Sequence, residues 1–472
     1  MKKKLENRKN NKSIIVSTLI FVITFIAMAG YLIYFNLTQA ESIINNSYNK
    51  RQGVLSRRTI RGSILSDDKT KLAVTNVDDD GNETRYYPYS GLFSHAIGYL
   101  NNGGYGLESL YGYYMLHSNQ NFFEQIGNDL SGNRNTGDNV VTTLNVGLQK
   151  ACYDALGSNR GAVIVMEPST GKILAMVSKP DFDPNTLAAN WSQITGEGSD
   201  SVLVNRATQG LYPPGSTFKL ITMLEYLREH KNDYGQYHYI CDGTYELGNN
   251  TINCVRTTAH GDVDLFSSLA VSCNCSFINI GLSLDLDRYK KTAEKMLFNK
   301  ELPTNLEYNK SRFVLNGESS EWDIAQTSFG QGKTVITPFH LALITCTIAN
   351  NGTLMEPYLV SSVESTNGMT VKKFKEEKYD TLITEKEASL LKKGMEQVVK
   401  DSFSWLFGGV EYTLAAKSGS AQYGTEGYEH SLYASFSPAD NPEMAVVEGG
   451  PQRNTTAAEV TKQIYDYYYS NK

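Results

Sequence analysis

The sequence has no excess of positive charge, few cysteines and only one long apolar run. Its 44 Lys and Arg residues are outweighed by 50 Asp and Glu residues, which gives a net charge of −6 and excludes the basic surface of a nucleic-acid-binding protein. We find no internal repeat and no low-complexity tract, which excludes a repeat architecture. A chain of 472 residues is too long for one compact core, so we expect two domains.

The single long apolar run covers residues 14–35 and carries no charge. It is long enough to cross a bilayer as a helix. The preceding residues 1–13 contain six Lys or Arg residues and one Glu, which predicts a cytoplasmic tail and an exported remainder. A cleavable signal peptide is the alternative, but its apolar core is shorter, about 7–15 residues. We therefore predict an uncleaved transmembrane anchor.

A possible nucleophile lies in residues 213–219, which read Pro-Pro-Gly-Ser-Thr-Phe-Lys and are followed by a mostly apolar segment. Pro-Pro-Gly predicts a rigid turn, and the apolar residues predict a buried helix. Ser216 and Lys219 then share one helix face, so the amine can lie beside the hydroxyl. Burial lowers the pKa of a lysine, which lets it act as the base that a serine nucleophile needs.

The Ser-x-x-Lys pattern is weak by itself, because it occurs four more times in this chain. The other copies are Ser47/Lys50, Ser66/Lys69, Ser169/Lys172 and Ser389/Lys392. The copy at 169 reads as a turn between two strands, and the copy at 389 lies on a charged helix. None of these copies has the turn and apolar helix that surround Ser216.

Two further motifs follow in order along the chain. Ser272-Cys273-Asn274 lies inside an apolar stretch, and Lys417-Ser418-Gly419 follows a strand-like segment. Ser-x-x-Lys, Ser-x-Asn and Lys-Ser/Thr-Gly in this order resemble the penicillin-binding proteins and serine β-lactamases.

The resemblance extends over nearly everything after the apolar run. Upstream, residues 61–64 and 106–108 resemble the amino-terminal module of the class B, monofunctional enzymes. The segments that resemble the transpeptidase domain are 161–176, 181–185, 205–207, 329–332 with 337–338, and 436–447. The chain is thus identified as similar to the class B peptidoglycan D,D-transpeptidases.

This resemblance implies a serine acyl-enzyme reaction on cell-wall stem peptides. Ser216 is the implied nucleophile and Lys219 its base, Ser272 relays a proton, and Asn274 positions Lys219 and binds a substrate amide. Lys417 supplies positive charge that helps to keep Lys219 neutral. Ser418, Gly419 and Ser420 belong to the substrate-binding strand, and the amides of Ser216 and Ser420 form the oxyanion hole. β-Lactams are expected to acylate Ser216, with no metal and no organic cofactor.

We predict four segments and an α+β fold. They are a cytoplasmic tail (1–13), an anchor (14–35), a small pedestal or dimerisation-like module (36–143) and a penicillin-binding transpeptidase domain (144–472). Apolar strands near both ends of the last segment predict one antiparallel sheet flanked by helices. The strand-like residues 140–144 and the aromatic residues of the module argue against a plain linker.

All six cysteines follow the anchor, outside the reducing cytosol. Cys241 and Cys254 flank a hairpin-like segment, so a disulfide between them is our first expectation. Two free thiols are the second, because connectivity cannot be read from sequence. A metal site that adds His238 or His260 is the third, since the spacing fits no standard zinc pattern. Cys273 is expected near the cleft as a small buried apolar residue.

The expected partners are stem peptides, β-lactams, the membrane and a multi-spanning glycan polymerase. The chain before residue 144 leaves no room for a polymerase domain of its own. Alternatives remain: a D,D-carboxypeptidase, a β-lactamase or β-lactam sensor, and a non-catalytic scaffold of wall assembly. The motifs cannot separate the first from a transpeptidase, because both reactions pass through the same serine ester.

Overall fold

The computed structural model describes residues 2–38, 59–196, 199–423, 428–451 and 456–472. The first helix, α1 (Lys2–Thr38), contains a 22-residue apolar span, Ile14–Phe35, with a mean hydropathy of 2.3 and no buried share. Among the described residues it is the one helix long and apolar enough to cross a membrane. The Ser47/Lys50 copy and the first part of the predicted module lie outside the described residues.

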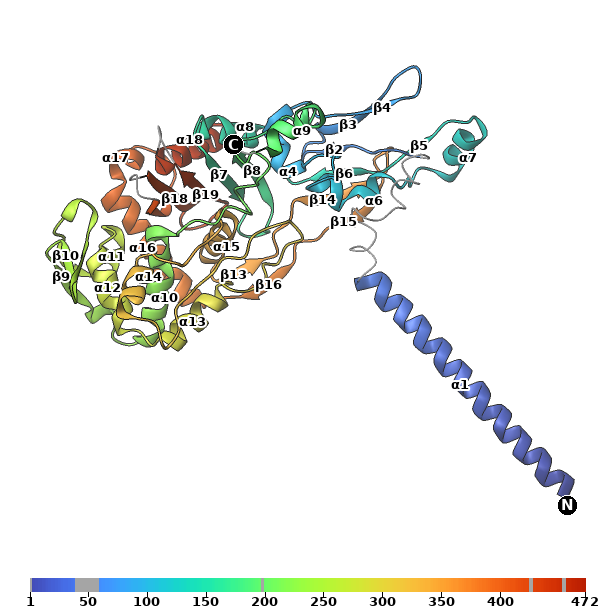
Figure 1. The fold of residues 1–472 in the computed structure, drawn as a ribbon, viewed down its shortest axis with the longest axis horizontal. Coiled ribbons are helices and arrows are strands. Elements are labelled where there is room, and N and C mark those ends of the chain that lie inside the picture. Colours follow the sequence, from blue (N-terminus) through green and yellow to red (C-terminus); the bar gives the residue numbers. More distant parts are fainter. Residues whose placement is uncertain (1, 39–58, 197–198, 424–427, 452–455) are drawn as a thin grey trace.

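The amino-terminal unit (residues 59–142) is built on a six-stranded sheet with the order β15-β14-β6-β2-β3-β4 (Figure 1). Its strands are β2 (Ile64–Leu65), β3 (Lys71–Val77), β4 (Glu83–Tyr86), β6 (Asn139–Thr142), β14 (Val360–Glu364) and β15 (Thr370–Lys373). A parallel pair, β1 (Thr59–Ile60) and β5 (Asn135–Thr136), and the helices η1 (Ser90–Phe93), α4 (Ser94–Ile97), α5 (Leu107–Leu110), α6 (Gly112–Met115) and α7 (Phe122–Leu130) complete it. The expected strand near residue 140 is present as β6.

Two strands of this sheet come from much later in the chain. β14 pairs with β6, and Val363 lies opposite Val140. The segment predicted as the module therefore does not complete its own sheet, and without β14 one edge of β6 would be unpaired. Sequence patterns could not show this, because strand partners far apart in the chain leave no local signal.

A buried charge cluster explains two of the upstream motifs. The Glu108 carboxylate is fully buried and accepts hydrogen bonds from Arg61 Nε at 2.8 Å and Arg85 Nε at 2.7 Å. The two guanidinium groups hold the pKa of Glu108 below its usual range despite its burial. Removing one partner of such a cluster leaves a buried charge uncompensated, so these residues hold the unit together.

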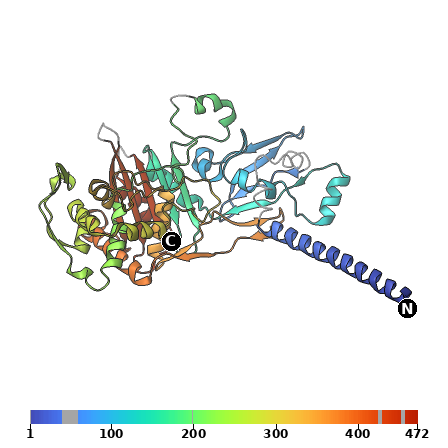
Figure 2. The ribbon, with the colours of Figure 1, turned by 60° about the horizontal axis from the view of Figure 1, so that its bottom comes forward.

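The carboxy-terminal unit contains a five-stranded sheet with the order β17-β18-β19-β7-β8, antiparallel throughout. Its strands are β7 (Gly161–Met166), β8 (Ile173–Lys179), β17 (Ala415–Tyr423), β18 (Tyr428–Ser437) and β19 (Met444–Pro451). Strands from both ends of the predicted domain thus lie side by side, dark red beside green in Figure 2, which confirms the predicted α+β plan. The Ser169/Lys172 copy lies in the turn between β7 and β8.

Alternate side chains of this sheet enter two separate cores. Val163 and Val165 pack with α8 (Val146–Leu156) and α18 (Ala457–Ser470), whereas Ile164 packs toward α15 (Pro338–Ala349). A strand that is buried on both faces needs apolar residues at every position, which is why 161–166 has no polar alternation.

The carboxy-terminal unit contains several further helices. They are α10 (Lys219–Glu229), α11 (Leu265–Ala270), α12 (Asn274–Ser283), α13 (Leu286–Lys295), α14 (Glu321–Ser328), α16 (Glu385–Ser402) and α17 (Ser404–Phe407), while α9 (Leu187–Thr195) lies apart. The smaller strands are β9 (His238–Cys241), β10 (Thr244–Leu247), β11 (Asn250–Asn253), β12 (Gly261–Asp264), β13 (Thr353–Met355) and β16 (Lys378–Thr381). Short 3-10 helices are η2 (Gly215–Phe218), η3 (Tyr234–Gln236) and η4 (Val255–Thr257).

Residues 181–185, one of the motif segments, join the two units. The Asn185 side chain accepts a hydrogen bond from Tyr87 N at 2.9 Å and donates one to Tyr87 O at 3.0 Å. A Cβ on Gly91 would lie 2.3 Å from Asp181 Oδ2, so a larger residue there would displace the Asp181 carboxylate. The motif therefore positions the amino-terminal unit on the carboxy-terminal one.

Candidate active site

All eight residues singled out from the sequence lie around one cleft of about 740 Å³. Ser216, Ser272, Asn274, Ser418 and Ser420 line it. Lys219 and Lys417 lie beneath its floor with no exposed surface. Gly419 lies against Pro214, at the back of the serine turn.

The first wall of the cleft, which we call the sheet wall, consists of η2 and β17. Ser216 is the second residue of η2, the turn that leads into α10, and Phe218 anchors this turn among the aromatic rings of Phe298 and Phe313. The turn enters a helix whose residues 219–227 are all buried, as predicted.

Close main-chain contacts hold the sheet wall together. Gly215 has φ = +53°, and a Cβ there would lie 2.7 Å from the Ser420 carbonyl oxygen. A Cβ on Gly419 would lie 2.6 Å from the Pro214 carbonyl oxygen. Only glycine allows two backbones to approach this closely, so the glycines of both motifs bring the serine turn against β17.

The second wall, the hairpin wall, is formed by residues 238–264. It contains two small antiparallel pairs, β9 with β12 and β10 with β11. The hairpin predicted between Cys241 and Cys254 is present as β10 and β11. Thr251, Asn253 and Arg256 of this wall line the cleft.

Ser272 and Asn274 lie where the hairpin wall meets the floor. Ser272 has φ = +54°, a left-handed conformation that is uncommon for residues other than glycine and that clusters at functional sites. Cys273 caps the start of α12, and its sulfur accepts a hydrogen bond from Ser276 N. The Asn274 side chain donates to Asn253 O at 3.0 Å and so fastens the motif to the hairpin wall.

The two buried lysines share one hydrogen-bond network. Lys219 Nζ donates to Ser272 O at 2.7 Å and Asn274 Oδ1 at 2.9 Å, and it lies 3.2 Å from Ser272 Oγ. Lys417 Nζ donates to Ser272 Oγ at 3.1 Å and Ser418 O at 2.9 Å. The Ser272 hydroxyl therefore lies between the two amines.

Burial changes the protonation of both amines. It lowers the pKa of Lys219 to about 8, in the direction that the sequence predicts. It also lowers the pKa of Lys417 well below its usual value, and the neighbouring Lys219 charge adds to that effect. The network therefore favours a single positive charge on the two amines, because two ammonium groups cannot share one dry site at low cost.

The Ser216 hydroxyl makes no hydrogen bond to the described residues, so the free site shows no direct Ser216–Lys219 bond. Its side chain is half-buried and opens onto the cleft. Catalytic hydrogen bonds are often long before substrate binds, so the shared location still suits proton transfer between them.

Several cleft residues escaped the sequence argument, among them Asn253, Arg256 and Trp322. Arg256 has φ = +56°, which no local pattern foretells. Asn253 precedes Cys254 directly, so the cysteine could have pointed to it. We find no comparable signal for Trp322.

The expected disulfide is wrong. Cys241 and Cys254 are unbonded, with their sulfurs 3.8 Å apart, whereas a disulfide bond measures about 2.05 Å. Their sulfurs belong to a larger group that includes His260, Cys273 and Cys275. His238 lies outside it, beside Asp262 on the surface.

Residues 161–466 match the penicillin binding protein transpeptidase domain, and residues 61–140 match the penicillin binding protein A dimerisation domain. The chain is 30% identical to peptidoglycan D,D-transpeptidase PbpA of Mycolicibacterium smegmatis over 81% of both chains. It is 32% identical to PbpA of Mycobacterium tuberculosis strain H37Rv, covering 70% of this chain and 72% of that protein.

A solved structure of penicillin-binding protein A from M. tuberculosis, as an imipenem acyl-enzyme complex, superposes with a TM-score of 0.79. It is 27% identical and covers 87% of this chain and 99% of its own. The D,D-transpeptidase domain of a peptidoglycan glycosyltransferase from Eggerthella lenta superposes with a TM-score of 0.77 at 27% identity. This match covers 88% of this chain and 99% of that one.

Proposed function

The chain belongs to the penicillin-binding protein transpeptidase family, and on that premise we propose that Ser216 carries its D,D-transpeptidase reaction on peptidoglycan stem peptides. The observation that carries this proposal is the hydrogen-bond network of Lys219, Ser272, Asn274 and Lys417 beside Ser216 in one cleft. Membership of the family supports the substrate class, and the hydrogen-bond network supports the assignment of these residues to the reaction.

In the first step the Ser216 oxygen attacks the carbonyl carbon of the penultimate D-Ala. The Ser216 proton passes to neutral Lys219, and a tetrahedral intermediate forms. A pKa of about 8 leaves part of the Lys219 population neutral near physiological pH, which this step needs. Acylation should therefore accelerate as the pH rises through this value.

The C–N bond then breaks and terminal D-Ala leaves as an amine. Its nitrogen receives a proton that Ser272 relays from Lys219, and a Ser216 ester remains. The position of Ser272 Oγ, within 3.2 Å of both lysine amines, suits this relay. Asn274 holds Lys219 in place and presents its remaining polar atoms to a substrate amide.

β17 supplies the substrate-binding edge. It is the outermost strand of its sheet, and Ser418 and Ser420 line the cleft. An extended peptide can pair with such an edge by strand addition. Ser418 and Ser420 are suited to bind the terminal carboxylate, and the main chain of Ser420 packs against Gly215, which suits a shared oxyanion hole of the Ser216 and Ser420 amides.

In the second step an amine of a neighbouring stem attacks the ester, forms the crosslink and returns the proton to Ser216. The test supplies a stem-peptide donor ending in D-Ala-D-Ala, with and without a D-amino acid or a second stem as acceptor. Mass spectrometry should find mainly exchanged or crosslinked peptide. Loss of terminal D-Ala alone, with abundant acceptor, would establish the carboxypeptidase alternative instead.

We further propose that α1 anchors the protein with its amino terminus in the cytoplasm. The exposed apolar span and the positive residues before it support this orientation. In intact cells, a membrane-impermeant thiol reagent should fail to label a cysteine placed at residue 5 but should label one placed at residue 79. The opposite pattern would reverse the orientation.

A multi-spanning glycan polymerase is the partner that we propose for α1 and the amino-terminal unit, since this arrangement suits an enzyme that crosslinks new strands. Replacing α1 with an unrelated transmembrane helix should keep β-lactam acylation and reduce co-purification of the polymerase activity. Unchanged co-purification with both α1 and the unit replaced would exclude this partnership.

A further inference from the structure

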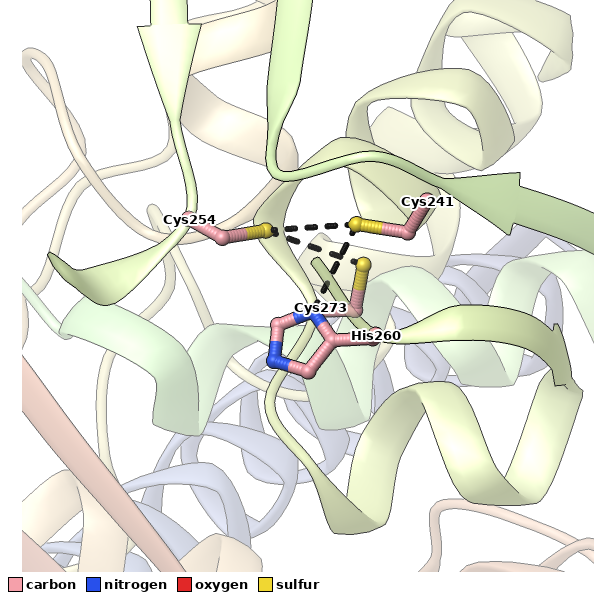
Figure 3. Close-up of side chains that lie close together, drawn as sticks. All are labelled: Cys241, Cys254, His260 and Cys273. Atoms are coloured by element: carbon pink, nitrogen blue, oxygen red, sulfur yellow. Dashed lines mark hydrogen bonds between the residues drawn. The ribbon is translucent and has the colours of Figure 1, made fainter. Parts of the chain in front are cut away.

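Three cysteines and one histidine converge beside the catalytic network. The ligand atoms of Cys241, Cys254, His260 and Cys273 all lie within 4.8 Å of one another. Figure 3 shows the four side chains pointing toward one another from separate segments: the end of β9, the end of β11, the start of β12 and the start of α12. Three of them are buried and His260 is half-buried.

The distances fit four ligands around one ion. With Zn–S bonds of about 2.3 Å and Zn–N bonds of about 2.0 Å, a tetrahedron has S–S edges of about 3.8 Å and S–N edges of about 3.5 Å. The Cys241–Cys254 and Cys254–Cys273 sulfur pairs are both 3.8 Å apart, and Cys241 Sγ lies 3.4 Å from His260 Nδ1. We propose that these four residues bind a structural zinc ion that positions Ser272 and Asn274.

The ligand set selects the metal. Three thiolates and one imidazole form a soft tetrahedral site, which favours Zn²⁺ over the oxygen-seeking cations. Four protein ligands leave no open position, so the ion is structural and not catalytic. The hydrogen bond from Ser276 N to the Cys273 sulfur, at the start of α12, stabilises a thiolate there.

Cys275 is the nearby thiol that we leave out of the site. Its sulfur lies 3.4 Å from that of Cys254, but it is not among the four mutually close donors. It provides a matched control, because it belongs to the same cluster, the same helix start and the same burial class as Cys273.

The hairpin wall contributes few side chains to the main core: Ile252 is buried in it, and Tyr239, Tyr245 and Leu247 pack against its edge. The apolar cluster beneath it consists of four cysteines with Tyr239, Tyr245 and Val271 packed against them. Ile240 and Val255 of this wall are 80% and 69% exposed. A wall with so small a core needs a further constraint, as small domains do when they use metals or disulfides.

The proposed ion connects directly to the general base. Cys273 lies between Ser272 and Asn274, and Cys254 follows Asn253, whose carbonyl oxygen binds the Asn274 side chain. Asn274 Oδ1 in turn accepts from Lys219. Fixing Cys254 and Cys273 on one ion therefore fixes both ends of the bond that holds Asn274, which makes the ligands positioning residues.

The first experiment measures metal and does not depend on activity. Full-length protein, purified in detergent from membranes, should contain about one zinc ion per chain by elemental analysis. Cys241→Ser, Cys254→Ser and Cys273→Ser should lose it, while Cys275→Ser and the distant core variant Cys346→Ala should keep it. Cobalt exchanged into the protein should give thiolate-to-metal charge-transfer bands that His260→Ala shifts.

Three results would overturn the site: wild-type protein without bound metal, metal content that none of the three serine variants reduces, or a Cys241–Cys254 disulfide recovered by peptide mapping without reductant. Retention of zinc by Cys273→Ser together with its loss in Cys275→Ser would also overturn the assignment of these four ligands.

The positioning role rests on the proposed function, so it has a separate test. A misplacement of about 1 Å can cost up to about 100-fold in rate. Cys273→Ser and the milder His260→Ala should lower the penicillin acylation rate constant by about 10- to 100-fold, and the dissociation constant of the complex that precedes acylation should change far less. Full acylation rates in zinc-free, folded His260→Ala would refute positioning but leave the metal site and the function of Ser216 intact.

Discussion

The two walls of the cleft are stabilised in different ways. The sheet wall is held by a five-stranded sheet with a core on each face and by main-chain contacts at Gly215 and Gly419. The hairpin wall has two short strand pairs and a core made largely of cysteines. The nucleophile lies on the first wall, whereas Ser272 and Asn274 lie beside the second. The reaction thus uses residues from two walls. The sheet wall is held rigid by its sheet and main-chain contacts, whereas the hairpin wall depends on the proposed zinc ligands to stay ordered.

The largest loss of acylation rate should come from substitution of Lys219, which lies between the walls. Lys219→Arg keeps a charge but cannot act as a base, because a guanidinium stays protonated. General-base catalysis contributes about 10²- to 10⁴-fold, so acylation by penicillin should fall by about that factor. Stopped-flow acylation measures it. A loss below about threefold would exclude Lys219 as the base.

The sheet wall can be tested at Gly419. In Gly419→Ala the new Cβ meets the Pro214 carbonyl oxygen at 2.6 Å and pushes β17 away from the serine turn. We expect about 1–3 kcal/mol lower stability and about a 100-fold lower acylation rate. Gly409→Ala is the control, because a Cβ there meets nothing within 4 Å. Equal rates in both variants would show that the close contact does not position the site.

The hairpin wall should respond selectively to metal removal. After zinc is chelated, amides of residues 238–264 should lose at least about tenfold in hydrogen-exchange protection, while those of 415–421 should change little. Re-addition of zinc should restore protection. Uniform loss across both walls would mean that the hairpin wall is not a separate unit of stability.

A further effect concerns pH and involves both walls. With a Lys219 pKa of about 8, the neutral fraction falls about tenfold for each pH unit well below that value. Acylation rates should therefore rise with pH and level off above about pH 9. A flat profile from pH 6 to 9, in protein that stays folded, would contradict a titrating Lys219.

Local sequence could predict most of the sheet wall and the β10–β11 hairpin, but not the contacts that hold the hairpin wall together. The spacing of Ser216 and Lys219 places them on one turn, and continuous apolar runs such as 161–166 predict strands buried on both faces. Ser272, Asn274 and Lys417 were recognisable only through the order of their motifs, because they meet Lys219 across more than 50 residues of chain.

The cysteines show why the remaining contacts of the site could not be predicted from the sequence. A pairing of Cys241 with Cys254 is the local solution, but tertiary folding adds His260 and Cys273 from other segments. The same reason hid β14 and β15, because β14 pairs with β6 about 220 residues earlier in the chain. The pairing of segments far apart in the chain is decided by tertiary packing, and the local pattern of a single sequence does not indicate it.

The most direct test of the account is acylation of Ser216→Ala by fluorescent penicillin, with thermal unfolding measured on the same sample. Ser216 is half-buried at the cleft surface and makes no hydrogen bond to the described residues, so its loss should cost little stability. The account predicts no covalent label and a nearly unchanged Tm. Persistent labelling of the folded variant would contradict the assignment of Ser216 as the nucleophile.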